Sequence, residues 1–99
     1  MSIDPSAPPW TFLSNHGHIL VCIARDPNIR VREIAQAVGI TERAVQRILG
    51  ELEEAEVISR RRQGRRTRYE IDSDQPLRHP VESDHSIEEL LRLARSKAS

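Results

Sequence analysis

Apolar residues recur at helical spacing in four stretches of the chain. In the first, Thr11 or Ser14 can cap a helix that continues to about Arg25, because both hydroxyls accept from free backbone N–H groups. Residues 26–28 end this helix, since proline disfavours helix in the residue before it. The stripe predicted to face the core consists of Leu13, His16, Leu20, Ile23 and Ala24.

The next two stretches are separated by a tight turn at Gly39. Residues 31–38 repeat apolar side chains at i, i+3, i+4 and i+7, which predicts a short amphipathic helix ending at Gly39. Thr41 is a good N-cap for a helix that ends near Ala55, and Ile40 can pack against Val45 to fix how the chain enters it. The predicted core residues of this helix pair are Val31, Ile34, Ala35, Val38, Val45, Ile48, Leu49 and Leu52.

A change of period after these helices predicts a β-hairpin. Residues 57–62 and 67–71 are short candidate strands, and Gly64 lies in the turn between them. In the second strand, apolar or small side chains alternate with charged ones, which gives one inward and one outward face. The inward residues are Thr67, Tyr69 and Ile71.

Polar segments flank the predicted elements. Residues 1–9 contain three prolines and are expected to form a flexible N-terminal arm, followed by one domain over residues 10–72. Residues 73–85 are polar and are expected to be an extended connector. Residues 86–99 hold a last short helix, with an apolar stripe of Ile87, Leu90, Leu91 and Ala94.

Composition fits one small domain and excludes several classes of protein. The chain has 99 residues, one cysteine and a formal net charge of zero. One cysteine excludes an intramolecular disulfide and a zinc site built from several cysteines. Residues 19–24, the longest apolar run, are far shorter than the ~20 residues that span a bilayer, and the N-terminus lacks the pattern of a secretory signal. We therefore expect a soluble, cytoplasmic protein without membrane contact.

The zero net charge conceals a segregation of charge along the chain. Residues 25–68 carry eleven arginines against seven acids, whereas residues 69–99 carry four bases against seven acids. Residues 57–68 hold six arginines and no acid. Arginine pairs bidentately with phosphate and with guanine, so this basic centre is compatible with a nucleic-acid partner. A solvated charged loop is the alternative interpretation.

Residues 31–50, VREIAQAVGITERAVQRILG, resemble a helix-turn-helix. Ala35 provides the small residue of the first helix and Gly39 the turn, with apolar residues at fixed offsets. With the arginine-rich hairpin included, residues 14–72 resemble winged helix-turn-helix transcription regulators of the MarR-like group. The resemblance implies a mainly α fold with a small β-hairpin: a three-helix core, a wing and a short C-terminal helix.

The sequence departs from this family pattern at two positions. Glu56 stands where these proteins usually have glycine, so the helix before it is expected to end less sharply. Val31 stands where an N-capping serine or threonine is common, so the second helix is expected to begin less well capped.

The resemblance implies that the third helix reads DNA, because the first turns of a recognition helix enter the major groove. Arg43 and Gln46 can read guanine and adenine, and Glu42 can accept from cytosine. Thr41 and Arg47 can hold phosphate. Weak surface pairs on a solvated face are the alternative. The candidate DNA-binding residues of this helix are Thr41, Glu42, Arg43, Gln46 and Arg47.

The hairpin provides a second candidate contact. A two-stranded tip is narrow enough to lie along phosphates or to enter a minor groove, where arginine is favoured. Arginines without an acid between them repel one another unless an anion is near. A loop that only keeps the protein in solution is the alternative interpretation. Arg62, Arg65 and Arg66 flank the turn, with Arg61 and Arg68 in support.

No arrangement of residues points to catalysis, a cofactor or a metal ion. Serine, histidine and aspartate occur without a nucleophile elbow or a phosphate-binding loop, so we expect no enzymatic activity. Cys22 is expected to be a buried apolar side chain, with a redox-sensing thiol as the alternative. His16 and His18 do not share a helix face, and His79 and His85 are expected in the connector, which disfavours a metal site.

Together these features predict a sequence-specific transcription regulator that binds double-stranded DNA as a homodimer. One recognition helix reads few base pairs, so two half-sites about 34–36 Å apart are expected. Residues 10–25 and 86–95 are the expected dimer surfaces, because they carry apolar stripes outside the reading head. The alternative is a winged-helix protein-interaction module without DNA binding, in which the acidic residues 69–99 engage a basic partner.

Overall fold

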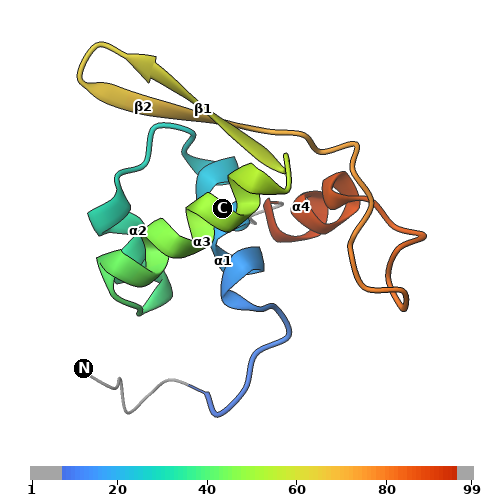
Figure 1. Cartoon of the computed structure of the whole chain (residues 1–99). Helices are drawn as coiled ribbons and strands as arrows, with labels where there is room; N and C mark the ends of the chain where they lie inside the picture. Colours follow the sequence, from blue (N-terminus) through green and yellow to red (C-terminus); the bar gives the residue numbers. More distant parts are fainter. Residues whose placement is uncertain (1–7, 96–99) are drawn as a thin grey trace.

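The computed structural model describes residues 8–95, which form helices beneath a protruding β-ribbon (Figure 1). This is the predicted mainly α fold with one hairpin, a winged helix-turn-helix. Most of the predicted N-terminal arm, residues 1–7, lies outside the described residues. The elements in chain order are α1 (Asn15–Arg25), α2 (Val31–Val38), α3 (Glu42–Glu54), β1 (Ile58–Gln63), β2 (Arg66–Ile71) and α4 (Ile87–Arg95).

α1 begins and ends where the sequence predicts. The Ser14 hydroxyl accepts from the Gly17 N–H at 3.4 Å and caps the helix. The predicted stripe was wrong about two residues: Ile19 is fully buried, whereas the His16 side chain is 44% exposed. α1 is packed by α2, α3 and α4, so it buries a wider face than a single stripe describes.

The turn between α2 and α3 depends on a left-handed glycine. Gly39 has φ +85°, a conformation that glycine adopts without steric cost. The N–H groups of Gly39 and Ile40 both donate to the carbonyl of Ala35, at 2.8 and 3.1 Å, and so satisfy the end of α2. This closure allows α3 to leave at an angle to α2.

The two helices of this pair begin differently. The Thr41 hydroxyl accepts from the Ala44 N–H at 3.0 Å and caps α3, as predicted. No side chain of the described residues caps the first N–H groups of α2, as expected from the missing serine or threonine. The Glu33 carboxylate instead accepts from the Arg30 N–H at 2.9 Å, and its charge suits the positive end of the helix dipole.

The end of α3 is also sharper than expected. Glu56 adopts the left-handed conformation, φ +62°, that the usual glycine would take. Its N–H donates to the Glu53 carbonyl and the Val57 N–H donates to the Leu52 carbonyl, both at 2.9 Å. This pair of bonds is a Schellman motif. The Gln75 side-chain amide, which donates to the Glu56 carbonyl at 2.6 Å, holds the turn from outside.

One hydrophobic core lies among α1, α2 and α3, and the base of the hairpin and α4 close it. Every buried side chain of the described residues is apolar or aromatic, so the polar faces of the helices are turned to solvent. The core residues are Ile19, Leu20, Ile23, Ile34, Ala35, Val45, Ile48, Leu49, Leu52, Val57, Ile58, Tyr69, Ile87 and Leu91.

The hairpin is antiparallel and slightly longer at its tip than predicted. Its register runs from Ile58 opposite Ile71 to Gln63 opposite Arg66, which leaves a two-residue turn. Gly64, the first turn residue, has φ +61°, which is the geometry of a type II′ turn that matches the strand twist. The Tyr69 N–H donates to the carbonyl of Pro27 at 2.9 Å, so the hairpin is anchored to the α1–α2 loop.

Residues 73–85 do not form the extended connector that was expected. They fold back on themselves, and Pro76 pairs with Ser86 in an isolated antiparallel bridge. Backbone groups of a polar stretch need partners, and this return lets the loop satisfy several of them internally. It also places α4 against α1, where Ile87 and Leu91 enter the core. None of the helices within residues 8–95 has the length and apolarity to cross a membrane.

Candidate nucleic-acid interface

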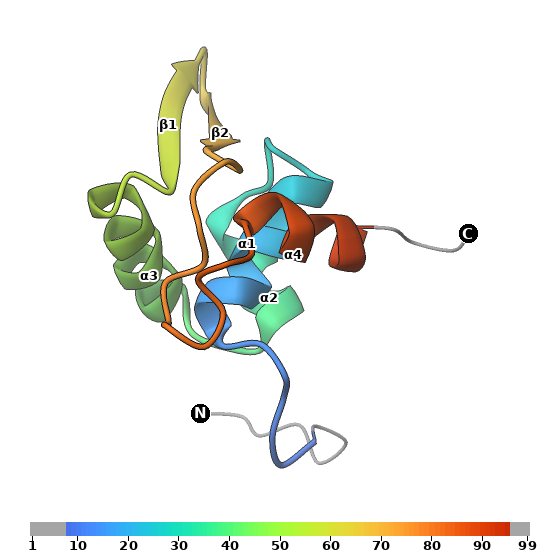
Figure 2. The same cartoon turned by 90° about the vertical axis from the view of Figure 1, so that its right-hand side faces the viewer.

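One face of α3 carries the polar side chains that the sequence analysis selected. All of them are exposed, whereas the opposite face of the helix is buried in the core. α3 and the hairpin lie on the same side of the molecule, away from α4 (Figure 2). This arrangement can place both on one ligand. The exposed residues are Thr41, Glu42, Arg43, Gln46 and Arg47.

Charge is segregated along α3 itself. The N-terminal half carries Arg43 and Arg47 against one acid, Glu42, whereas the C-terminal half carries Glu51, Glu53 and Glu54 and no base. The N-terminal end of a helix also has unsatisfied N–H groups and a partial positive charge. An anionic surface is therefore favoured at the first turns of α3 and disfavoured at the last.

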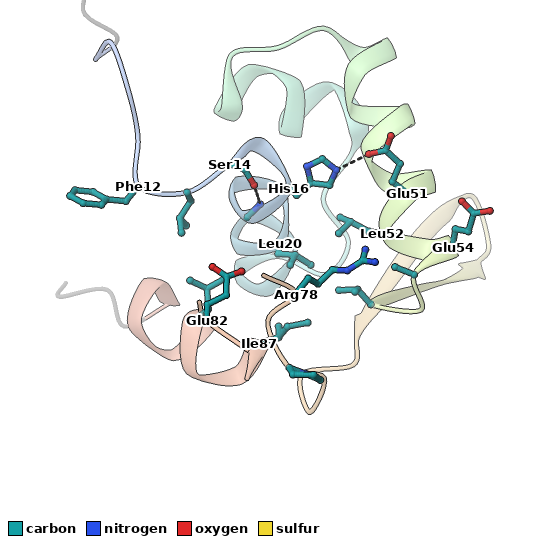
Figure 3. Close-up of a pocket in the computed structure, with 16 residues that line it drawn as sticks. Phe12, Ser14, His16, Leu20, Glu51, Leu52, Glu54, Arg78, Glu82 and Ile87 are labelled. Carbon is teal, nitrogen blue, oxygen red and sulfur yellow. Dashed lines mark hydrogen bonds and ion pairs between the residues drawn. The ribbon is translucent and has the colours of Figure 1, made fainter. Parts of the chain in front are cut away.

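Arg47 is not independent of the acidic half of α3. Its Nη1 lies 3.1 Å from Glu51 Oε2, and the other oxygen of that carboxylate, Oε1, lies 2.7 Å from His16 Nε2 on α1 (Figure 3). The hydrogen bond from His16 is the main cause that lowers the pKa of Glu51, with Arg47 adding to it. Glu51 therefore stays ionised between two cationic or donor groups.

Glu51 and His16 were both missed as neighbours of the predicted site. The i,i+4 spacing of Arg47 and Glu51 is visible in the sequence and predicts a helical ion pair. The contact with His16 is not visible, because it joins residues 35 positions apart and requires the packing of α1 on α3.

The predicted wing arginines differ in how they are held. Arg61 Nη2 lies 3.5 Å from Glu70 Oε1, and Arg62 Nε donates to the Gly64 carbonyl at 3.1 Å. Arg65 stands at the exposed tip and has no hydrogen-bond or ion-pair partner within residues 8–95. Of these three, Arg65 can therefore turn to an anion without breaking a contact.

The other two wing arginines lie on β2. Arg66 Nη2 donates to the Asn28 carbonyl at 2.8 Å and so braces the hairpin against the α1–α2 loop. Arg68 is half-buried and directly opposite Arg61 in the register. Like charges placed opposite each other repel, so this pair favours a nearby anion. Glu70 next to them offsets part of that repulsion.

Arg60 belongs to the same run of arginines but has a structural contact. Its Nε lies 3.1 Å from Glu53 Oε1 at the end of α3, and its side chain is about a third exposed. Together with the backbone anchor at Tyr69, this pair fixes the hairpin relative to α3. Arg60 was not among the predicted wing contacts, and its pairing with Glu53 agrees with leaving it out.

A groove of about 830 Å³ lies between α1, the end of α3, the connector and α4 (Figure 3). Leu20, Leu52 and Ile87 line its apolar part. Phe12 stands at its edge with its side chain 93% exposed. This groove was not predicted from the sequence, because the folded connector forms one of its walls.

Cys22 packs against the core, as expected, but is only half-buried. Burial raises the pKa of its thiol, and the nearby Arg25 opposes this only in part. A raised pKa lowers the thiolate fraction, which favours packing over redox chemistry. Among the described residues, no group of three or more His, Cys, Asp and Glu side chains is placed to hold a metal ion.

Comparison with known proteins gives one informative match. Residues 13–59 match a family model described as winged helix-turn-helix DNA-binding. This segment is just under half of the chain and contains α1, α2, all of α3 and the first residues of β1. It stops before Arg61, so the tip of the hairpin lies outside it. No curated protein gives a significant match. The family match supports DNA binding by this part of the chain.

Proposed function

We propose that this chain is a transcription regulator that binds double-stranded DNA through the winged helix-turn-helix formed by residues 10–72. The observation that carries the proposal is that α3 and the arginine-rich hairpin lie on one side of the molecule, where the polar side chains of α3 are exposed. We further assign it to the MarR-like group and to the cytoplasm. The proposal assigns no catalytic step and no cofactor.

Sequence preference is assigned to α3. Arg43 and Gln46 are three residues apart, so their side chains share one helix face. Both are exposed, and neither has a hydrogen-bond or ion-pair partner in the described part of the chain. Arginine is suited to guanine and glutamine to adenine in the major groove. Glu42 can accept from cytosine, while Thr41 and Arg47 contact phosphate.

Sequence-independent affinity is assigned to the wing. Arg65 at the tip contacts the phosphate backbone or the minor groove, and Arg62 and Arg66 join it by leaving their carbonyl partners. Arg61 and Arg68 provide the positive potential at the base, where their mutual repulsion is relieved by phosphate. Contacts of this kind release counterions, so affinity falls steeply as salt rises.

We further propose a homodimer, because one recognition helix reads too few base pairs for useful specificity. Ile87 and Leu91 of the α4 stripe pack into the core of the same chain. The surface available for a dimer contact is therefore smaller than the predicted residues 10–25 and 86–95. Among residues 8–94, four large apolar side chains remain exposed, and none of them belongs to α3 or the hairpin. Such side chains mark association surfaces when they gather in one region. They are Trp10, Phe12, Val81 and Leu93.

Selection of bound sites from random duplex DNA tests this function. We expect an enriched motif arranged as an inverted repeat, with half-sites one helical turn apart, about 10–11 base pairs. A protein-interaction module is the competing function, and the apolar groove beside Phe12 favours it. Failure to enrich any sequence, together with no affinity for random duplex DNA at low salt, would support that alternative and contradict DNA binding.

A further inference from the structure

Three side chains form a continuous chain of contacts between α1 and the proposed DNA-binding face of α3. Arg47 contacts one oxygen of Glu51 at 3.1 Å, and His16 contacts the other at 2.7 Å. We propose that Glu51 is a positioning residue that competes with DNA for Arg47, and that protonation of His16 weakens this competition so that DNA binds more tightly on acidification. The proposal rests on the proposed function, since it concerns the same face of α3.

The competition follows from the geometry of Glu51. The Arg47 and Glu51 side chains are 62% and 48% exposed, so their pair is a weak surface ion pair that a phosphate can replace. When Arg47 turns to phosphate, the Glu51 carboxylate loses a cationic partner. It remains ionised one helical turn from the DNA, where its charge opposes binding.

Proton uptake follows because His16 is the partner that Glu51 retains. A neutral imidazole donates one hydrogen bond to Glu51 Oε1, whereas an imidazolium also neutralises the carboxylate charge. Histidine changes charge between pH 5 and 8, so the change is within reach of mild acid. The complex, in which Arg47 has left Glu51, favours protonated His16 more than the free protein does. By linkage, acidification then tightens binding.

Other charged groups face the same region and set the background for this effect. The groove that His16 lines also contains Glu54 from α3, and Arg78 and Glu82 from the connector, whereas α4 contributes apolar side chains. Within the described part of the chain, Glu51 alone lies within hydrogen-bond distance of the His16 ring, so it dominates the coupling.

The chain offers a matched control for this pair. His85 Nδ1 lies 3.0 Å from Glu89 Oε1 at the start of α4, and both side chains are exposed like those of His16 and Glu51. This second histidine–glutamate contact is on the element that lies away from α3 and the hairpin (Figure 2). It therefore provides a histidine–glutamate contact that does not involve Arg47.

The first test measures affinity for one fixed duplex at pH 7.5 and pH 5.5 at constant salt. The wild-type protein is expected to bind about two- to fivefold more tightly at pH 5.5, the range set by one exposed ion pair. His16→Gln is expected to remove this gain, and His85→Gln to keep it. A His16→Gln variant that kept the full gain would overturn the proposal.

The second test removes the competing carboxylate. Glu51→Gln keeps the shape of the side chain and is expected to bind the duplex about two- to fivefold more tightly at pH 7.5. Glu54→Gln makes the same change of charge on the same helix without the Arg47 contact, and is expected to gain less. In the Glu51→Gln background, adding His16→Gln is expected to change nothing further. Equal gains for Glu51→Gln and Glu54→Gln would overturn the proposal.

Failure of DNA binding and failure of the His16–Glu51 coupling give different results. If the wild-type protein binds no duplex DNA at any pH, the proposed function is contradicted, and so is the proposed coupling between His16 and DNA binding. If the wild-type protein binds DNA but all of these variants respond to pH alike, only the coupling is contradicted.

Discussion

Glu56 shows how a single residue can depart from a family pattern without changing the fold. It takes the left-handed conformation that glycine usually provides, with φ +62°. A residue with a Cβ atom pays about 1–2 kcal/mol for this conformation. The two Schellman hydrogen bonds and the contact from Gln75 hold it there.

Replacing Glu56 with glycine is expected to stabilise the protein. Glu56→Gly removes the steric cost but frees the unfolded chain, so we expect the free energy of unfolding to rise by about 1 kcal/mol. Urea denaturation measures this change. Glu54→Gly, in the last turn of α3, is the matched control and is expected to lower stability by up to about 1 kcal/mol. Destabilisation by Glu56→Gly would contradict the assigned backbone strain.

Gln46 provides the prediction for sequence preference. Gln46→Ala is expected to cost about 1–3 kcal/mol of affinity for the selected site, because one bidentate base contact is lost. Affinity for random duplex DNA is expected to stay the same, since phosphate contacts are untouched. Competition binding measures both quantities, with Gln36→Ala on α2 as the control. Equal losses on both kinds of DNA would rule out base reading by Gln46.

At the scale of elements, the wing is predicted to act through charge. Arg65→Ala is expected to weaken binding to all duplexes and to reduce the slope of log K against log salt by about 0.9, the value for one phosphate contact. Thermal unfolding is expected to be unchanged, because Arg65 has no hydrogen-bond or ion-pair partner in residues 8–95. Arg92→Ala on α4 removes the same charge elsewhere and is expected to leave the slope intact. An unchanged slope for Arg65→Ala would refute the wing contact.

The start of α4 provides a prediction about pH. The hydrogen bond with Glu89 is the main cause that raises the pKa of His85, and the same bond with His85 lowers the pKa of Glu89. A raised histidine pKa stabilises the fold below its ordinary value of 6.5, and this is lost as pH rises through the folded value. A lowered glutamate pKa stabilises the fold above its ordinary value of 4.5, and this is lost as pH falls further.

The pair is therefore expected to stabilise α4 most between about pH 4.5 and 6.5. The difference in unfolding midpoint between the wild-type protein and His85→Gln should be larger at pH 5.5 than at pH 8. Denaturant titrations at the two pH values measure it. A difference that grew towards pH 8 would contradict the assigned contact.

Local rules were enough to predict most elements. The helices α1, α2 and α3 have nearly the predicted bounds. Their ends are set by the expected caps at Ser14 and Thr41 and by the expected turn at Gly39. The errors arose where tertiary contacts decide. Ile19 is buried because three helices surround α1, and residues 73–85 fold back because their backbone groups find partners in one another.

The residues of the candidate site could be predicted from the sequence, but the contacts among them could not. The exposed residues of α3 could be predicted because they lie opposite the buried apolar stripe of the same helix. On β2, the alternating pattern correctly placed Tyr69 on the inward face. Which arginines are tethered does not follow from the sequence. Arg66 contacts Asn28 and Glu51 contacts His16 only after the chain has folded, since each pair is more than thirty residues apart.

At the scale of the whole molecule, the zero net charge is the sum of separated regions. The basic turns of α3 and the wing lie on one side, and acidic residues follow in the connector and α4. Repulsion of DNA by the acidic segment weakens non-specific contacts by other faces. The proposed orientation on DNA therefore follows from where the charges lie, not from their total.

The proposed dimer gives a prediction at the same scale. Phe12→Ser and Leu93→Ser each remove a large exposed apolar side chain and are expected to weaken self-association without lowering stability, because both side chains are more than 80% exposed. Sedimentation equilibrium measures the change. A wild-type protein that remained monomeric at micromolar concentration would contradict the dimer.

The central claim is that α3 and the wing contact double-stranded DNA. The most direct measurement is a titration of the isotope-labelled protein with duplex DNA, following the backbone amide resonances by NMR. We predict that the largest shifts map to residues 41–47 and 61–68, while those of α4 change little. Shifts confined to the groove beside Phe12 and α4, or no shifts at low salt, would contradict the account.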